Sequence, residues 1–233
     1  MVKICFWSDN HNEVIKEEKR RKILTVFSIS LLFMLLSMTT VYASESHPTV
    51  NRLAGVDKYE TAFDIAKAGW QQSDCAILAY GGNYPDALAA APLARKFNAP
   101  ILLTEKDSLN SYTSTVLADL KVKTVYIVGG TGVISTNVEK QLTDLGYSVN
   151  RIAGYDKYET SIKIAEQLDN VIEVAVTTGD DYADALSIAS VAAMHQVPII
   201  IVPKDAISDS IQNYLTAHDI KKAYILGDQS IIS

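Results

Sequence analysis

An internal repeat is the feature that most constrains what this chain of 233 residues folds into. Residues 52–61 (Arg-Leu-Ala-Gly-Val-Asp-Lys-Tyr-Glu-Thr) recur as residues 151–160, with eight identities in ten positions. The match then continues after a slip of one residue, as far as the end of the sequence. Because a long repeat is one structural unit used more than once, the sequence predicts two copies of the same fold.

Each copy alternates short apolar runs with longer amphipathic stretches. This alternation is typical of strands that lead into helices around a mostly parallel sheet. In the first copy the expected strands are 50–53, 75–79, 100–103 and 125–128, and the expected helices are 58–69, 86–96, 110–120 and 135–145. Asp57 and Glu60 fit a capping box at the start of the first helix. The predicted fold class is α/β, with tandem Rossmann-like or flavodoxin-like units and open sheets.

The repeat also sets the expected boundaries, with unit 1 at 50–148 and unit 2 at 149–233. No Gly/Pro/Ser-rich linker separates the units, so we expect them to pack tightly. Unit 2 has no counterpart for residues 136–148, a whole helix, and is expected to be truncated. Two explanations stay open: the protein continues beyond Ser233, or a degenerate gene product ends there with its last strand edge uncovered. Because an uncovered strand edge promotes aggregation, we favour truncation or completion by a partner.

The N-terminal segment has the pattern of a secretory signal peptide. Four basic residues at 19–22 precede an apolar run at 23–38, and Val41-Tyr42-Ala43 is a small-residue cleavage site. We expect a signal peptide at 1–43, cleavage after Ala43, a linker at 44–49 and a secreted product at the cell surface. A retained membrane helix is the alternative, but the run is shorter than the roughly 20 residues that span a bilayer.

Charge and cysteine content narrow the classes of partner. The whole chain has a net charge of −6, and the predicted leader removes more basic than acidic residues. An acidic protein is a poor match for nucleic acid, which is bound through many basic contacts to phosphate. Without Cys5, the exported part keeps only Cys75, so no intramolecular disulfide is expected.

The loops that follow the expected strands hold the first group of candidate ligand-binding residues. In open α/β sheets, ligands bind beyond the carboxyl ends of the strands, and helix N-termini there favour anionic groups. The candidates in the two copies of this loop are Asn83, Tyr84 and Asp86, then Tyr182 and Asp184. Asp86 and Asp184 also fit a purely structural role as helix N-caps.

A second group surrounds two arginines at equivalent positions. Arg52 is close in sequence to Asp57 and Tyr59, and Arg151 to Asp156 and Tyr158. A guanidinium can hold a phosphate or carboxylate through two hydrogen bonds. The alternatives are a structural Arg–Asp pair that closes a turn, and tyrosines that pack in the core instead of stacking on sugars.

Catalytic and cofactor sites have little support in the sequence. Residues 129–135 resemble a dinucleotide fingerprint, but the third glycine is Ser135 and the second copy loses the glycines. The sequence contains no H-E-x-x-H motif, no paired-cysteine metal spacing and no G-x-S-x-G elbow. We therefore expect no catalytic residues, no resident metal and no cofactor.

The ordered motifs resemble the type 2 cell-wall-binding repeat of Gram-positive surface proteins and wall amidases. The residues that carry the resemblance are R-L-A-G-x-D-K-Y-E-T, then Y-P-D-A-L, A-P-I-L-L and Y-I-V-G-G, and it covers residues 50–233. The resemblance implies a non-covalent anchor that binds an anionic secondary wall polymer or a peptidoglycan-associated glycan. It also implies three repeats around a pseudo-threefold axis, so self-association or a third repeat would complete this chain.

Two further expectations follow from the resemblance and the charge. An acidic module needs local groups to hold an anionic polymer, and Arg52, Arg151, the helix N-termini and a bridging divalent cation are the candidates. The alternative function is that of an accessory or fragment of a wall hydrolase, an N-acetylmuramoyl-L-alanine amidase, because such repeats are commonly attached to that enzyme.

Overall fold

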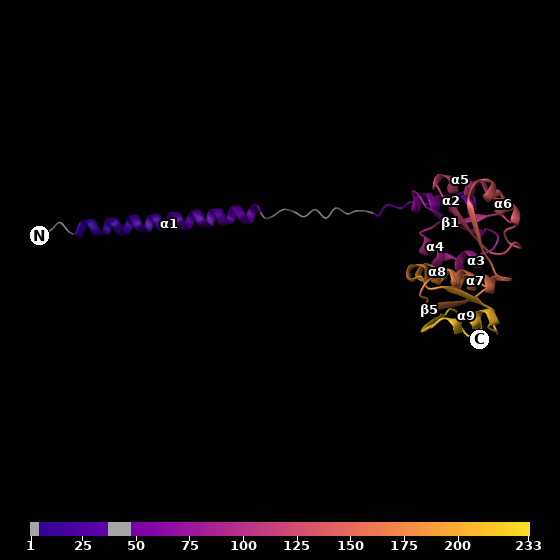
Figure 1. Cartoon of the computed structure of the whole chain (residues 1–233). Coiled ribbons are helices and arrows are strands. Elements are labelled where there is room, and N and C mark those ends of the chain that lie inside the picture. Colours follow the sequence, from indigo (N-terminus) through magenta and orange to yellow (C-terminus); the bar gives the residue numbers. More distant parts are fainter. Residues whose placement is uncertain (1–4, 37–47) are drawn as a thin grey trace. The chain divides into compact units, whose positions relative to one another are not determined.

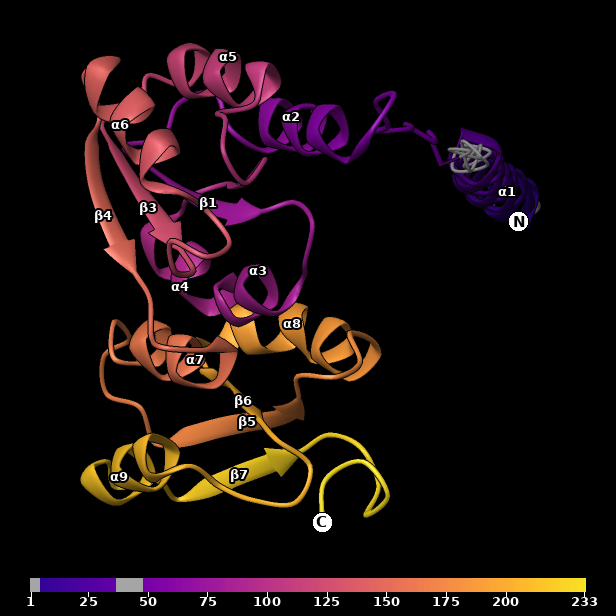
Figure 2. The ribbon, with the colours of Figure 1, turned by 90° about the vertical axis from the view of Figure 1, so that its right-hand side faces the viewer.

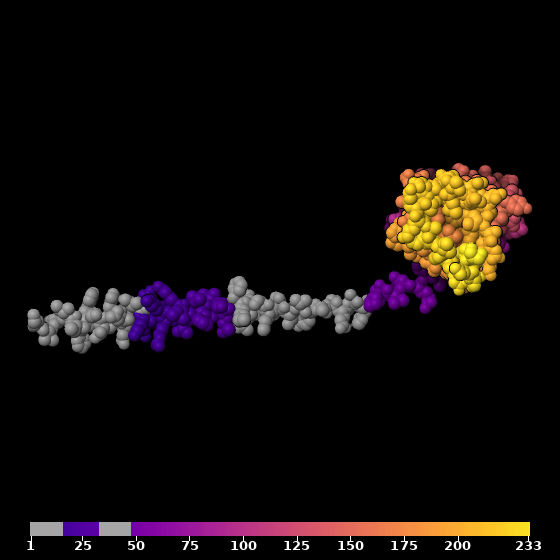
Figure 3. All heavy atoms as spheres, turned by 90° about the horizontal axis from the view of Figure 1, so that it is seen from below, coloured from indigo at the N-terminus to yellow at the C-terminus, as the bar shows by residue number. Residues whose placement is uncertain are grey.

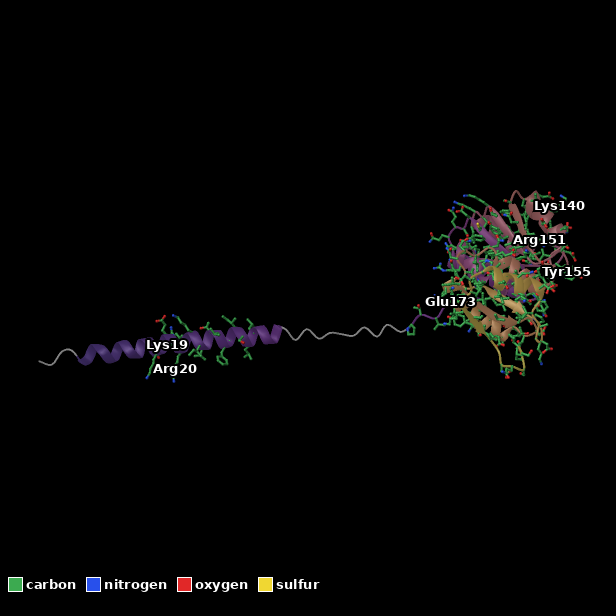
Figure 4. All side chains as sticks on the ribbon, turned by 60° about the horizontal axis from the view of Figure 1, so that its bottom comes forward. Lys19, Arg20, Lys140, Arg151, Tyr155 and Glu173 are labelled. Atoms are coloured by element: carbon green, nitrogen blue, oxygen red, sulfur yellow. The ribbon has the colours of Figure 1, made fainter. Side chains whose placement is uncertain are left out.

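The computed structural model describes residues 5–36 and 48–233. Contacts divide the chain into two units, Met1–Val50 and Asn51–Ser233, which are treated separately below (Figure 1). In the first unit, α1 (Cys5–Leu36) carries Lys19 and Arg20, which project from the helix in Figure 4. The predicted apolar run begins within α1, whereas the cleavage site at Ala43 lies outside the described residues. None of the described helices has both the length and the apolar character required to cross a membrane.

A four-stranded parallel sheet forms the centre of the first repeat. Its strands are β1 (Cys75–Tyr80), β2 (Ile101–Thr104), β3 (Thr124–Val128) and β4 (Ser148–Ile152), in the order β2-β1-β3-β4. The middle of β1, Ala76 to Ala79, is fully buried, because helices cover both faces of the sheet. The parallel α/β architecture predicted from the sequence is thereby confirmed.

Five described helices belong to the first repeat, and the side chains of Asp57 and Asn110 cap two of them. The five helices are α2 (Lys58–Gly69), α3 (Pro85–Ala89), α4 (Ala91–Phe97), α5 (Ser111–Asp119) and α6 (Thr136–Asp144). Asp57 Oδ1 accepts hydrogen bonds from the backbone N–H groups of Tyr59 and Glu60, at 2.8 and 2.9 Å. The N-cap role of Asp57 is therefore confirmed. Glu60 Oε2 accepts from the N–H of Val56 instead of that of Asp57, so the second bond of the expected capping box is displaced by one residue.

The second repeat builds a smaller sheet from the same kind of segments. Its strands are β5 (Glu173–Thr178), β6 (Ile199–Val202) and β7 (Lys222–Ile225), in the order β6-β5-β7. Its helices are α7 (Lys157–Ala165), α8 (Ala183–His195) and α9 (Asp209–Ala217). Among the described residues, this sheet has three strands where the first repeat has four.

One long helix was expected at 86–96, but the structure divides it into α3 and α4 at Ala90. Pro92 explains the break, because proline lacks the N–H that would bond the carbonyl of Leu88 and its ring crowds that carbonyl. In the second repeat Ser190 stands at the position of Pro92, and α8 runs unbroken.

The expected strand at 50–53 is the second correction. Residues 48–54 belong to no strand, whereas their counterpart β4 pairs with β3, the last strand of the preceding repeat. A strand needs a neighbouring edge for its backbone hydrogen bonds, and residues 50–53 have no repeat before them in the described chain. The four-stranded sheet therefore takes its last strand, β4, from the second copy of the sequence repeat.

The two repeats share a core. Leu93 and Val128 of the first repeat belong to the same buried cluster as Ile164 and Leu168 of the second. Helices α3, α4, α7 and α8 lie between the two sheets (Figure 2). The tight packing expected from the missing linker is present.

Candidate functional site

The ten-residue motif of the repeat forms the turn and the N-cap at the beginning of a helix. In the second repeat the N–H of Gly154 donates to Thr160 Oγ1 at 3.0 Å, and the N–H of Tyr155 donates to Glu159 Oε2 at 2.7 Å. Asp156 caps α7 through the N–H of Glu159 at 2.8 Å. A side chain at Gly154 would meet Glu159 Cβ at 2.5 Å, so the turn requires glycine. Local structure therefore accounts for most of the repeated identities.

Asp86 lies in the first turn of α3, after β1. The N-cap of α3 is Tyr84 and the first helical residue is Pro85, whose fixed φ suits that position. Asp184 holds the same place in α8, where Tyr182 is the N-cap. The N-cap role expected for both aspartates is thus wrong.

Burial perturbs the carboxyl group of Asp86. Its Oδ1 is buried without a hydrogen-bond partner among the described residues. Burial raises the pKa of Asp86 to about 6, because the charged form loses hydration. Gly129, with φ of +109°, allows this close packing, since a Cβ there would lie 2.6 Å from Asp86 Oδ2.

Asp86 lines a pocket of about 150 Å³ at the junction of the two repeats. The first repeat contributes loop residues after β1 and β3, and the second contributes the start of α7. The lining residues are Asn83, Pro85, Asp86, Gly130, Gly132, Val133, Gly154, Tyr155, Asp156, Lys157 and Thr160. Of the predicted residues, Asn83, Asp86 and Asp156 are therefore brought together.

Two residues of this junction pocket, Tyr155 and Lys157, are not among the candidates predicted from the sequence. Tyr155 is 97% exposed and lies at the surface in Figure 4. Lys157 Nζ donates to the carbonyl of Gly179 at 2.6 Å and to Asp180 Oδ1 at 2.9 Å. Tyr155 could not be found by comparing the copies, because Val56 replaces it in the first repeat.

The remaining predicted tyrosines divide into a pair in mutual contact, half-buried Tyr84 and exposed Tyr182, and a packed pair. Tyr84 and Tyr182 meet edge to face, with ring centroids 5.5 Å apart. Tyr84 also lines a second cavity of about 330 Å³, and Asn83 borders both this cavity and the junction pocket. Tyr158 packs against the shared core, and burial raises the pKa of the half-buried Tyr59.

The two arginines differ. Arg151 in β4 donates from Nε and Nη2 to Glu139 Oε2, at 3.0 and 2.8 Å, and from Nη1 to the carbonyl of Gly129 at 2.8 Å. It therefore ties β4 to α6 and to the end of β3. Arg52 is exposed and does not line the junction pocket. The predicted acidic neighbour of Arg151, Asp156, caps α7 instead.

Within residues 5–36 and 48–233, no group of three or more His, Cys, Asp or Glu side chains is placed to hold a metal ion. The junction pocket contains carboxylates, an amide and an ammonium group, so hydrogen bonding to a polar ligand is the chemistry that its side chains offer.

Comparison with known proteins extends the description. The chain is 33% identical to the N-acetylmuramoyl-L-alanine amidase LytC of Bacillus subtilis (strain 168), over 91% of this chain and 42% of the amidase. It is 36% identical to the amidase enhancer of the same organism, over 75% of this chain and 25% of the enhancer. The chain thus spans less than half the length of these relatives.

Solved structures share the fold. Cwp6 from Clostridium difficile superposes with a TM-score of 0.73 at 32% identity, over 82% of this chain and 32% of Cwp6. Cwp8 from the same organism gives 0.74 at 33%, over 80% of this chain and 32% of Cwp8. Residues 52–139 and 151–233 each match Cell wall binding domain 2 (CWB2). The chain belongs to the cell wall binding domain 2 family.

Proposed function

We propose that the chain is a non-covalent cell wall anchor that binds an anionic wall polymer at the junction pocket. Membership of a cell wall binding family supports a wall or surface location for this role. The observation that carries the proposal is Asp86 Oδ1, a buried acceptor that lacks a partner among the described residues. A ligand hydroxyl that donates to the Asp86 carboxyl group would supply the hydrogen bond that buried polar atoms normally have.

The surroundings of Asp86 suit a sugar unit. Asn83 and Asp156 present further polar groups to the junction pocket, and Tyr155 offers an exposed ring to an apolar sugar face. Asn83 connects this pocket to the cavity beside Tyr84, so a ligand longer than one unit can extend along the loop. The proposed recognition therefore depends mainly on the sugar units of the polymer.

Charge has a smaller part in the proposal. The chain has a net charge of −6, and repulsion of an anionic polymer is screened beyond about 8 Å at physiological salt. Lys157 is the cation of the junction pocket, and Asp180 offsets its charge. Glu139 likewise offsets the charge of Arg151. A divalent cation that bridges polymer phosphates to Asp86 and Asp156 would help, and a chelator tests for it.

Tyr155→Ala tests the proposal without disturbing the core, because the ring is almost fully exposed. Retention on purified walls should weaken about fivefold, equivalent to about 1 kcal/mol of lost ring contact. The matched control is Val56→Ala, at the same motif position in the first repeat, where the side chain is 86% exposed and outside the junction pocket.

Two further arms identify the ligand. Walls stripped of their anionic polymer should no longer retain the chain, and addition of a chelator reports any bridging cation. Equal retention of both variants, or full retention on stripped walls, would contradict the proposal.

The similarity to an amidase and an amidase enhancer favours a second candidate function. In this alternative, the repeats are an accessory part of a wall hydrolase. Purified walls incubated with an N-acetylmuramoyl-L-alanine amidase, with and without this chain, distinguish the two candidates, because hydrolysis lowers the turbidity of the suspension. Faster clearing in the presence of the chain would support the accessory role, and an unchanged rate would contradict it.

A further inference from the structure

The segment before α2 carries the sequence of a strand but pairs with nothing in the described chain. Val50-Asn51-Arg52 is identical to Val149-Asn150-Arg151, and Ala-Gly follows two residues later in both copies. The second copy is β4, which pairs in parallel with β3, so that Tyr126 lies opposite Asn150 and Val128 opposite Ile152. The first copy lies in no strand, and Leu53 is exposed.

Strand β7 shares sequence and backbone features with β3, the strand that pairs with β4. Tyr224-Ile-Leu-Gly227 is the counterpart of Tyr126-Ile-Val-Gly129, and the two glycines share a left-handed φ, +111° and +109°. Within the described residues β7 is the last strand of its sheet, and Ile225 is 64% exposed. An unpaired strand edge of this kind is a template for a further strand.

We propose that the outer edge of β7 binds Asn51–Leu53 of a second copy of the chain as a parallel fourth strand. The register of β3 and β4 places Asn51 opposite Tyr224 and Leu53 opposite Leu226. The carbonyl of Leu53 then accepts from the N–H of Gly227, as the carbonyl of Ile152 accepts from Gly129 at 3.0 Å. This inference does not depend on wall binding.

The guanidinium of Arg52 gains a partner in the same arrangement. Arg151 Nη1 donates to the carbonyl of Gly129 at 2.8 Å, and the equivalent acceptor for Arg52 is the carbonyl of Gly227. Arg151 has a further partner in Glu139 of α6. The second repeat has no helix equivalent to α6 in the described chain, so Arg52 would keep only the backbone contact.

Apolar surfaces in the first repeat and beside β7 also indicate that a second copy of the chain binds at β7. Leu93 of α4 and Ile164 of α7 are buried in the core that the repeats share. Their counterparts Val191 and Ile65 are 49% and 50% exposed. Val191 borders a cavity of about 340 Å³ that Tyr224 of β7 also lines. The surfaces that the two repeats bury against each other are therefore exposed at opposite ends of the pair.

A second molecule of this chain fits the edge of β7, because each molecule carries both of the complementary surfaces. The C-terminal residues, yellow in Figure 3, form the face that includes β7, and Asn51–Leu53 belongs to the first repeat. Because the two surfaces differ, the contact is heterologous and joins copies head to tail. Covering an exposed strand edge and an apolar cavity together gives the association its favourable free energy.

Proline substitutions test the strand pairing in the form predicted to begin at Ser44, which keeps all of Asn51–Ser233. The carbonyl of Ile152 faces β3, so by alternation the backbone of Asn150 also faces β3 and that of Val149 faces away. Asn51→Pro therefore removes an N–H that points at β7, whereas Val50→Pro removes one that points away. Light scattering over a concentration series should show at least twice the monomer mass for the wild type and Val50→Pro, and the monomer mass for Asn51→Pro.

Chemical cross-linking tests the register. Asn51→Cys and Tyr224→Cys chains, each also carrying Cys75→Ala, are mixed and treated with a short bis-maleimide. The expected product is a dimer that contains one chain of each kind. Lys140→Cys in place of Tyr224→Cys should give no such dimer, because Lys140 is accessible to the reagent but lies on α6 and not on β7. A wild type that stays monomeric and forms no cross-linked dimer would overturn the proposal, as would oligomers that Asn51→Pro leaves intact.

Discussion

At the scale of single residues, equivalent side chains of the two repeats have different environments. Asp86 and Asp184 hold the same position after the same kind of strand. The first repeat packs against the second around Asp86, whereas Ala183 and Leu186, next to Asp184, are exposed. The sequence predicted that Asp86 belongs to a loop beyond a strand, but its burial depends on the neighbouring repeat and could not be predicted.

The pKa of Asp86 gives the protein a specific pH dependence. A carboxyl group with a raised pKa in the folded state binds its proton more tightly there than in the unfolded chain. The raised pKa of Asp86 therefore contributes favourably to the free energy of unfolding below about pH 4. This contribution falls as the pH rises to about 6, and it is lost above that pH. A shift of about 2 units corresponds to about 3 kcal/mol.

Asp86→Asn removes this ionisation. The free energy of unfolding should rise by about 1–3 kcal/mol at pH 7 and change little at pH 4, because the buried charge is lost. Urea unfolding at both pH values measures the effect, and Asp184→Asn is the control at the same helix position of the second repeat. A stability gain that is equal at pH 4 and pH 7 would show that the charge of Asp86 is not its cause.

At the scale of elements, apolar runs and capping residues located most strands and helices to within a residue or two. The division between α3 and α4 could also have been predicted, because Pro92 stands inside the expected helix. The place of β4 could not, since its partner is set by the packing of two repeats and not by local sequence. The same reasoning explains why the expected strand at 50–53 is absent.

Ser190 is the element-scale test, because it occupies the position of Pro92 in the unbroken helix α8. Ser190→Pro should destabilise the protein by about 3 kcal/mol, through the lost hydrogen bond to the carbonyl of Leu186 and the clash of the ring with that carbonyl. Ser190→Ala keeps the N–H and should change stability by less than about 0.5 kcal/mol. Denaturant unfolding compares the two variants, and equal stability would contradict the assigned cause of the break.

At the scale of the whole molecule, the candidate site exists because two repeats pack together. Asn83 and Asp86 come from one repeat, and Tyr155, Asp156 and Lys157 from the other. Sequence comparison found the residues that recur in both copies, and several of these serve the helix start. It missed Tyr155 because Val56 replaces it in the first repeat. It did not single out Lys157, which recurs as Lys58, because the place of Lys157 in the pocket depends on how the two repeats pack.

Binding of a wall polymer at the junction of the two repeats should perturb the backbone amides that line the pocket. The most direct measurement is NMR mapping of backbone amide shifts while the isolated anionic polymer is added to the isotope-labelled chain. We expect the largest shifts at Asn83, Gly130, Tyr155 and Lys157, and no change at Val56 in the first repeat. Shifts confined to residues outside the junction pocket would contradict this binding site. The absence of shifts at a polymer concentration high enough to saturate binding would contradict it as well.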